Sequence, residues 1–228
     1  MYRIIQLDEL NHQENQMIQD TQAFVYHILK DDTSGHDWWH IQRVTQMTIR
    51  LARIEKGTNL MICVLAALLQ DTIDDKIVEN ESLAIKKVTQ FLLETGVESK
   101  TSTEIMDIIT KMSFKGGQNS GYTLTLEGQV VQDADRLDAI GAIGIARTLY
   151  YSGHKGRPIH DPSMEPRDNM TLQDYRSGEE SAIMHFYEKL LKLKDLMNTK
   201  SGRQLATGRH QYLENYLEQF YQEWEAER

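Results

Sequence analysis

The apolar run from Leu60 to Leu69 is the feature that most constrains how this chain can fold. It reads LMICVLAALL, carries no charge, and is followed at once by QDTIDD, where carboxylates and an amide crowd together. A helix that is apolar all round is typically buried all round. The carboxylates at its end then lie at the edge of a core, where burial is costly unless they are paired, hydrogen-bonded or bound to a metal. We therefore expect the chemistry of this chain at residues 70–75.

The rest of the chain has the periodicity of helices. Apolar residues recur at helical spacing, and no strand-like alternation persists. Helices are predicted at 13–30, 38–55, 59–70, 81–95, 101–112, 125–150, 179–198 and 203–226. The sequence thus predicts an all-α bundle of roughly seven to nine helices. Because no linker-like segment interrupts its 228 residues, we expect a single domain over residues 1–228, with a core at about 20–150 and C-terminal helices at about 175–228 packing on it.

Composition and charge argue against several classes of protein. The chain has 25 Lys and Arg against 34 Asp and Glu, a net charge of −9, and no basic block, which argues against nucleic-acid binding. Its longest apolar run is too short for the roughly 20 residues that span a bilayer, and the first residues do not resemble a signal peptide. We therefore expect a cytoplasmic protein without membrane association. The one cysteine, Cys63, excludes an intrachain disulfide and behaves as a small hydrophobe.

Polar side chains fall at three places on otherwise apolar helices. They are His40, the pair Gln70 and Asp71, and the pair Asp133 and Asp135. Each has a simple structural explanation: a hydrogen-bonded core histidine, a helix cap at Asp71, and aspartates that are solvated or in a surface ion pair. Taken together, an imidazole and several carboxylates converging in a helical core are what a divalent metal needs.

Three segments carry a resemblance to a known family. HDWWHIQRV (36–44), AALLQDTIDDK (66–76) and VQDADRLDAIGAIGIAR (131–147) together resemble the HD-domain superfamily of metal-dependent phosphohydrolases, in particular its bacterial branch of predicted hydrolases. The likeness includes SFKGG (113–117) and GRPIHDP (156–162) and extends over nearly the whole chain. It implies an HD-type helical domain and a divalent metal cofactor.

The family pattern H…HD…D implies the metal ligands. Carried over by position, these are His40, Gln70, Asp71 and Asp135, with Gln70 standing where the family has a histidine. A glutamine amide can offer only its carbonyl oxygen, which is a harder ligand than an imidazole nitrogen. The resulting set favours Mg²⁺ or Mn²⁺ over Zn²⁺, Ni²⁺ or Fe. The alternative is a site that binds no metal.

The implied reaction is hydrolysis of a small phosphoester, with nucleotides as one candidate class. Asp71 would orient the nucleophile, and Asp74 or Asp75 would take its proton. The candidate contacts to the substrate phosphates are His36, Arg43, Lys76, Lys115 and Arg157. The rival interpretation is a degenerate HD-fold protein that binds a nucleotide or a protein partner without turnover. The oligomeric state stays open, a homodimer included.

Overall fold

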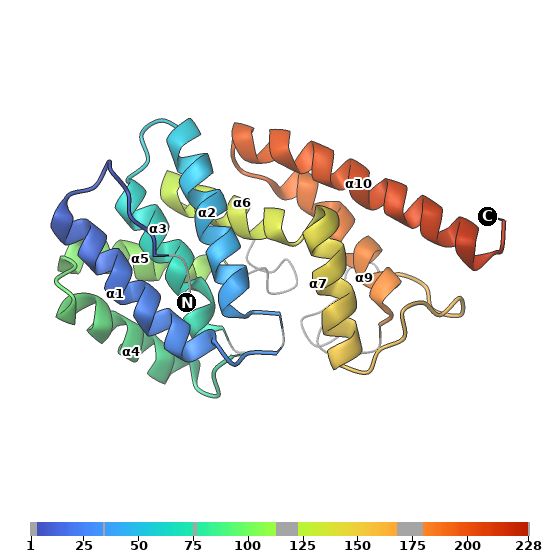
Figure 1. Ribbon diagram of the computed structural model, residues 1–228, viewed down its shortest axis with the longest axis horizontal. Helices are drawn as coiled ribbons and strands as arrows, with labels where there is room; N and C mark the ends of the chain where they lie inside the picture. Colours follow the sequence, from blue (N-terminus) through green and yellow to red (C-terminus); the bar gives the residue numbers. More distant parts are fainter. Residues whose placement is uncertain (1–3, 34, 75–76, 113–122, 168–179, 228) are drawn as a thin grey trace. The chain divides into compact units, whose positions relative to one another are not determined.

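The computed structural model describes residues 4–33, 35–74, 77–112, 123–167 and 180–227 (Figure 1). Within these residues the chain forms nine α-helices and two 3-10 helices and no strand, so the all-α prediction is confirmed. The chain divides into two compact units, Met1–Gln132 and Asp133–Arg228, and each is described by itself. The single domain stays a prediction. Asp75, Lys76 and Lys115 lie outside the described residues.

The first unit is built around the apolar run. Its elements are α1 (His12–Leu29), α2 (Trp38–Ile54), α3 (Leu60–Leu69), η1 (Gln70–Ile73), α4 (Glu81–Glu94), α5 (Ser99–Lys111) and the first half of α6 (Leu126–Asp138) (Figure 1). Helix α3 contacts α1, α2 and α5. Every side chain from Ile62 to Leu69 is buried, so the apolar run forms the centre of this unit.

Side-chain caps fix where these helices begin. Asn11 accepts a hydrogen bond from the Glu14 amide, and the Glu14 carboxylate accepts one in return from the Asn11 amide. In the same way the Asp37 carboxylate accepts a hydrogen bond from the His40 amide at 2.9 Å. An N-cap of this kind typically contributes about 1 kcal/mol. The cap at Asp37 places His40 in the first turn of α2, where its side chain is buried.

The second unit contains the second half of α6 and four further elements. These are α7 (Gly141–His154), α9 (Ala182–Glu188), η3 (Leu190–Leu196) and α10 (Lys200–Trp224) (Figure 1). Helix α10 contacts α7 and η3, and α9 contacts α7 and η3. Buried Phe186, Leu193 and Leu213 form part of its core. In the described part of the chain no helix is both long and apolar enough to cross a membrane.

The structure corrects the prediction of one helix over residues 125–150. Helix α6 ends at Asp138, Ile140 is extended, and α7 begins at Gly141 with φ +74°. This left-handed conformation favours glycine, because a side chain there would crowd the backbone. At Gly144, an added Cβ would overlap the backbone of Ala139. The prediction was wrong because the apolar spacing continues across the break.

The predicted helix over residues 179–198 is also divided. Helix α9 ends at Glu188, Lys189 leaves the helical conformation with φ −134° and ψ −59°, and the chain continues as the 3-10 helix η3. The apolar residues of η3 recur at a spacing that suits either kind of helix. The sequence pattern therefore located the buried Phe186, Leu190 and Leu193. It wrongly included Leu196, which is exposed, and it did not distinguish the two geometries.

Asp133 has a structural role in the second unit. Its Oδ1 accepts hydrogen bonds from the Asn198 amide and side chain at 2.8 and 2.9 Å, and its Oδ2 accepts from the amide and hydroxyl of Thr199, both at 2.8 Å. A Cβ at position 202 would overlap the Asp133 carboxylate, and Gly202 leaves that space free. Four donors satisfy this buried carboxylate, which thereby fixes α6 against the start of α10.

Candidate metal centre

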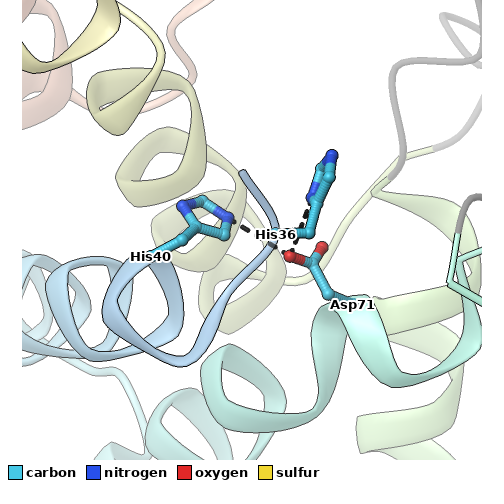
Figure 2. Close-up of side chains that lie close together, drawn as sticks. All are labelled: His36, His40 and Asp71. Atoms are coloured by element: carbon cyan, nitrogen blue, oxygen red, sulfur yellow. Dashed lines mark hydrogen bonds and ion pairs between the residues drawn. The ribbon is translucent and has the colours of Figure 1, made fainter. Parts of the chain in front are cut away.

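Three side chains of the first unit converge on one point (Figure 2). His36 Nδ1 lies 3.0 Å from Asp71 Oδ2, and His40 Nε2 lies 3.3 Å from the same oxygen. The two imidazole rings are nearly perpendicular, with an interplanar angle of 88° and centroids 5.7 Å apart. One ligand atom from each residue lies within 4.8 Å of the other two. Within the described ranges, no other cluster of histidine, cysteine and carboxylate side chains has ligand atoms this close together.

The backbone holds these side chains in place from two directions. His36 precedes α2, and its amide donates a hydrogen bond to the Asp32 carboxylate at 3.1 Å. His40 follows the Asp37 cap in the first turn of α2. Asp71 comes from η1, where the end of α3 tightens into a 3-10 turn with all four residues buried. Local hydrogen bonds and the 3-10 turn therefore fix the backbone positions from which both imidazoles and the carboxylate extend.

The site combines burial with charge. His40 is fully buried, and Asp71 is 8% exposed. Burial alone would raise the pKa of the Asp71 carboxyl, but the charges of His36 and His40 and their hydrogen bonds outweigh it, so this pKa lies well below its ordinary value. Asp71 is therefore ionised at neutral pH. Metal binding requires this ionised carboxylate together with imidazoles that have lost their protons.

Gln70 adds a buried amide beside this cluster. Its Nε2 lies 3.5 Å from His40 Nε2, at the outer limit of a hydrogen bond, and its Oε1 has no hydrogen-bond partner among the described residues. A buried acceptor without a partner costs about 1–3 kcal/mol, which a bound ligand could recover. A half-turn of the amide would present this oxygen toward His40. Imidazole nitrogens, a carboxylate and an unpartnered amide oxygen are donors that fit a divalent ion.

The other predicted site residues are distributed as follows. Asp74 follows directly after η1 and is half-buried, and Arg43 is half-buried on α2. Asp135 lies on α6 in the second unit. The guanidinium of Arg157, also in the second unit, pairs with the buried Glu180 carboxylate, so part of its charge is already neutralised. The functional roles of these residues stay predictions.

His36 was predicted to contact substrate phosphate, and that role stays a prediction. The structure brings its imidazole to Asp71, a contact that the sequence did not predict. The available signal was the four-residue spacing between His36 and His40. That signal was weak because Asp37, the helix cap, separates His36 from the apolar face on which His40 was identified.

Several known proteins are similar to this chain. No family model matches the chain. It is 38% identical over 207 residues to the uncharacterised protein YpgQ of Bacillus subtilis, which covers 90% of this chain and 93% of that protein. A crystal structure from Lactobacillus plantarum is 44% identical, with a TM-score of 0.83, over 92% of this chain and 98% of that one. An HD-superfamily hydrolase from Bacillus thuringiensis is 46% identical, with a TM-score of 0.73, over 93% of this chain and 99% of that one.

The chain belongs to the HD superfamily. The HD-superfamily resemblance of its three motifs is thereby confirmed. Among the similar structures, YpgQ of Bacillus subtilis has been solved in complex with ADP. That structure is 34% identical to this HD-superfamily chain, with a TM-score of 0.76, and the match covers 92% of this chain and 96% of that one. The bound ADP is an observation on YpgQ.

Proposed function

We propose that this HD-superfamily chain is a metal-dependent phosphohydrolase that acts on a small phosphoester, with nucleotides as the favoured class. The observation that carries the proposal is the convergence of His36 Nδ1 and His40 Nε2 on Asp71 Oδ2. The relationship to an HD-superfamily hydrolase supports the reaction class. The ADP complex of YpgQ supports a nucleotide substrate.

In this proposal some residues of the site bind the metal, and others orient the attacking water and accept its proton. His40 and Asp71 would hold a divalent ion, with Gln70 as a further ligand. Such an ion would lower the pKa of a water molecule and polarise a phosphoryl oxygen. The remaining oxygen of Asp71 would orient the attacking water. Asp74 or Asp75 would accept its proton, since a carboxylate can act as the general base.

An assay of phosphate release in the presence of Mn²⁺ or Mg²⁺ tests the proposal. The substrates are ADP, other nucleotides and a chromogenic phosphomonoester. We expect metal-dependent release that falls at least about a hundredfold in His40→Ala and Asp71→Asn, because each loses a metal ligand. The matched control is His12→Ala, which removes an exposed histidine at the start of α1 and should leave the rate unchanged. Release that persists in both site variants would contradict the proposed site.

One observation favours the rival function. Gln70 stands where the family pattern has a metal-binding histidine. A site weakened in this way would suit a protein that binds a nucleotide without hydrolysing it. Tight binding of ADP with no phosphate release at any metal concentration would support this rival and reject the hydrolase.

A further inference from the structure

We infer that His36 is a metal ligand in this chain and supplies the imidazole that the family pattern places at position 70. The inference rests on the proposed metal site and specifies its ligands more closely. His36 was expected from the sequence to contact substrate phosphate. The positions of His36 Nδ1, His40 Nε2 and Gln70 Nε2 around Asp71 support a role in metal binding.

The first argument is the spacing of the donor atoms. Two ligands that bind one ion with bonds of about 2.1 Å, at angles between octahedral and tetrahedral, lie roughly 3.0–3.4 Å apart. His36 Nδ1 and His40 Nε2 lie 3.0 and 3.3 Å from Asp71 Oδ2. Both nitrogens approach the same carboxylate oxygen, and they lie within 4.8 Å of each other. A single ion would contact all three atoms once the two imidazoles shift toward each other, because two bonds of about 2.1 Å span at most about 4.2 Å.

The second argument is the orientation of Gln70. The end of its amide that faces His40 is Nε2, which has no lone pair to offer a cation. Gln70 must turn its amide over before it can coordinate, whereas His36 already directs Nδ1 at Asp71 and needs to release the proton on that nitrogen. His36 therefore provides the second nitrogen donor by losing a proton, with its ring already turned toward Asp71.

The third argument is the environment of the His36 ring. Its backbone is held by Asp32, and its side chain is 19% exposed, at the edge of the site. A metal-bound imidazole needs a partner for its other N–H, and water can serve at such an exposed edge. His40 is buried and approaches from α2, so the two rings reach Asp71 from separate sides (Figure 2).

The ligand set changes the expected metal. Two imidazole nitrogens and a carboxylate suit transition ions such as Mn²⁺, whereas Mg²⁺ prefers oxygen ligands and retains its waters. With His36 as a ligand, we expect Mn²⁺ to bind more tightly than Mg²⁺. The competing explanation is that His36 only orients Asp71 through a hydrogen bond.

A double-mutant cycle separates these explanations, with Mn²⁺ affinity measured by titration calorimetry on the full chain. His36→Ala should weaken Mn²⁺ binding at least about tenfold. In a Gln70→His background the same change should cost less than about threefold, since the new imidazole restores the donor. His12→Ala serves as the matched control and should bind Mn²⁺ as the native chain does.

Pulsed electron paramagnetic resonance of bound Mn²⁺ gives a second readout, because it detects nitrogen atoms attached directly to the ion. We expect two imidazole nitrogens in the native chain and one in His36→Ala. Unchanged affinity and nitrogen count in His36→Ala, together with lost binding in His40→Ala, would overturn the role of His36 and leave the proposed function standing. A native chain that binds neither Mn²⁺ nor Mg²⁺ would overturn both.

Discussion

Asp133 and Asp71 are both buried carboxylates, and they are satisfied in different ways. Asp133 accepts hydrogen bonds from four donors of Asn198 and Thr199, which occupy both of its oxygens. Asp71 directs one oxygen at two imidazoles, those of His36 and His40. Beside it, Gln70 leaves a buried acceptor without a described partner. At the scale of single residues, incomplete hydrogen bonding therefore distinguishes the candidate centre from a structural carboxylate.

Cys63 offers a prediction about reactivity. Its thiol is buried in α3, and burial together with the nearby Glu127 raises its pKa to about 12. Because the thiolate is the reactive form, the native protein should not react with a disulfide reagent such as Ellman's reagent at pH 8 on the timescale of minutes. The same protein in guanidinium chloride is the control and should react at once. Rapid labelling of the native protein would contradict the burial of this thiol.

The candidate centre could be predicted in part. His40 followed from the apolar face of its helix, and Asp71 from its place at the end of the apolar run, so both depend on local patterns. The contact between His36 and Asp71 could not be predicted in this way. It depends on how the segment before α2 turns and on the hydrogen bond from the His36 amide to Asp32, and neither leaves a periodic signal.

At the scale of the elements, helices with strong periodicity and a clear cap were predicted within a residue or two. The helix predicted at 38–55 is α2, Trp38–Ile54, and the one predicted at 81–95 is α4, Glu81–Glu94. The break between α6 and α7 was missed because it leaves the apolar spacing intact. Such a break is set by the backbone conformation of two residues, Ile140 and Gly141.

The break between α6 and α7 leads to a prediction about the stability of the folded protein. Gly141→Ala should destabilise the protein by about 1–3 kcal/mol, because φ is +74° there and the new Cβ would lie 3.1 Å from side-chain atoms of Arg209. The matched control is Gly153→Ala in the same helix, where nothing lies within 4 Å of the added Cβ. That change should be neutral or stabilise by up to about 1 kcal/mol. Urea unfolding measures both, and equal effects would contradict the strained turn.

At the scale of the whole molecule, the second unit contains ion pairs whose carboxylates are buried. In the second unit, Arg157 pairs with Glu180, and Arg167 pairs with Glu188 at 2.8 Å. Both glutamates are buried, and His185 Nδ1 lies 3.5 Å from Glu180. Breaking a buried ion pair leaves an uncompensated charge, so these contacts matter to the stability of the folded unit.

This ion-pair cluster predicts how stability depends on pH. Burial would raise the pKa of Glu180, but the close approach of His185 and the charge of Arg157 outweigh it, and the pKa lies below its ordinary 4.5. Unfolding then takes up a proton below about pH 4.5. The stabilisation is present above that pH and is lost as pH falls through the lower pKa of the folded state.

Thermal unfolding between pH 7 and pH 3 tests this dependence. The native chain should lose stability more steeply below about pH 4.5 than Glu180→Gln, which has no proton to take up at this position. The variant should be less stable at pH 7, because Arg157 loses its charged partner. Parallel curves for the two proteins below pH 4.5 would show that Glu180 does not carry the effect.

The close approach of the Asp133 carboxylate to Gly202 has a consequence for how this sequence can change over evolution. Because the carboxylate fills the volume that a Cβ at position 202 would need, position 202 cannot take a larger residue while Asp133 is kept. A relative with alanine at position 202 would need a smaller or displaced side chain at position 133, and the donors of Thr199 would then need another acceptor. Positions 133, 199 and 202 should therefore vary together among relatives, although 66 residues separate the first two.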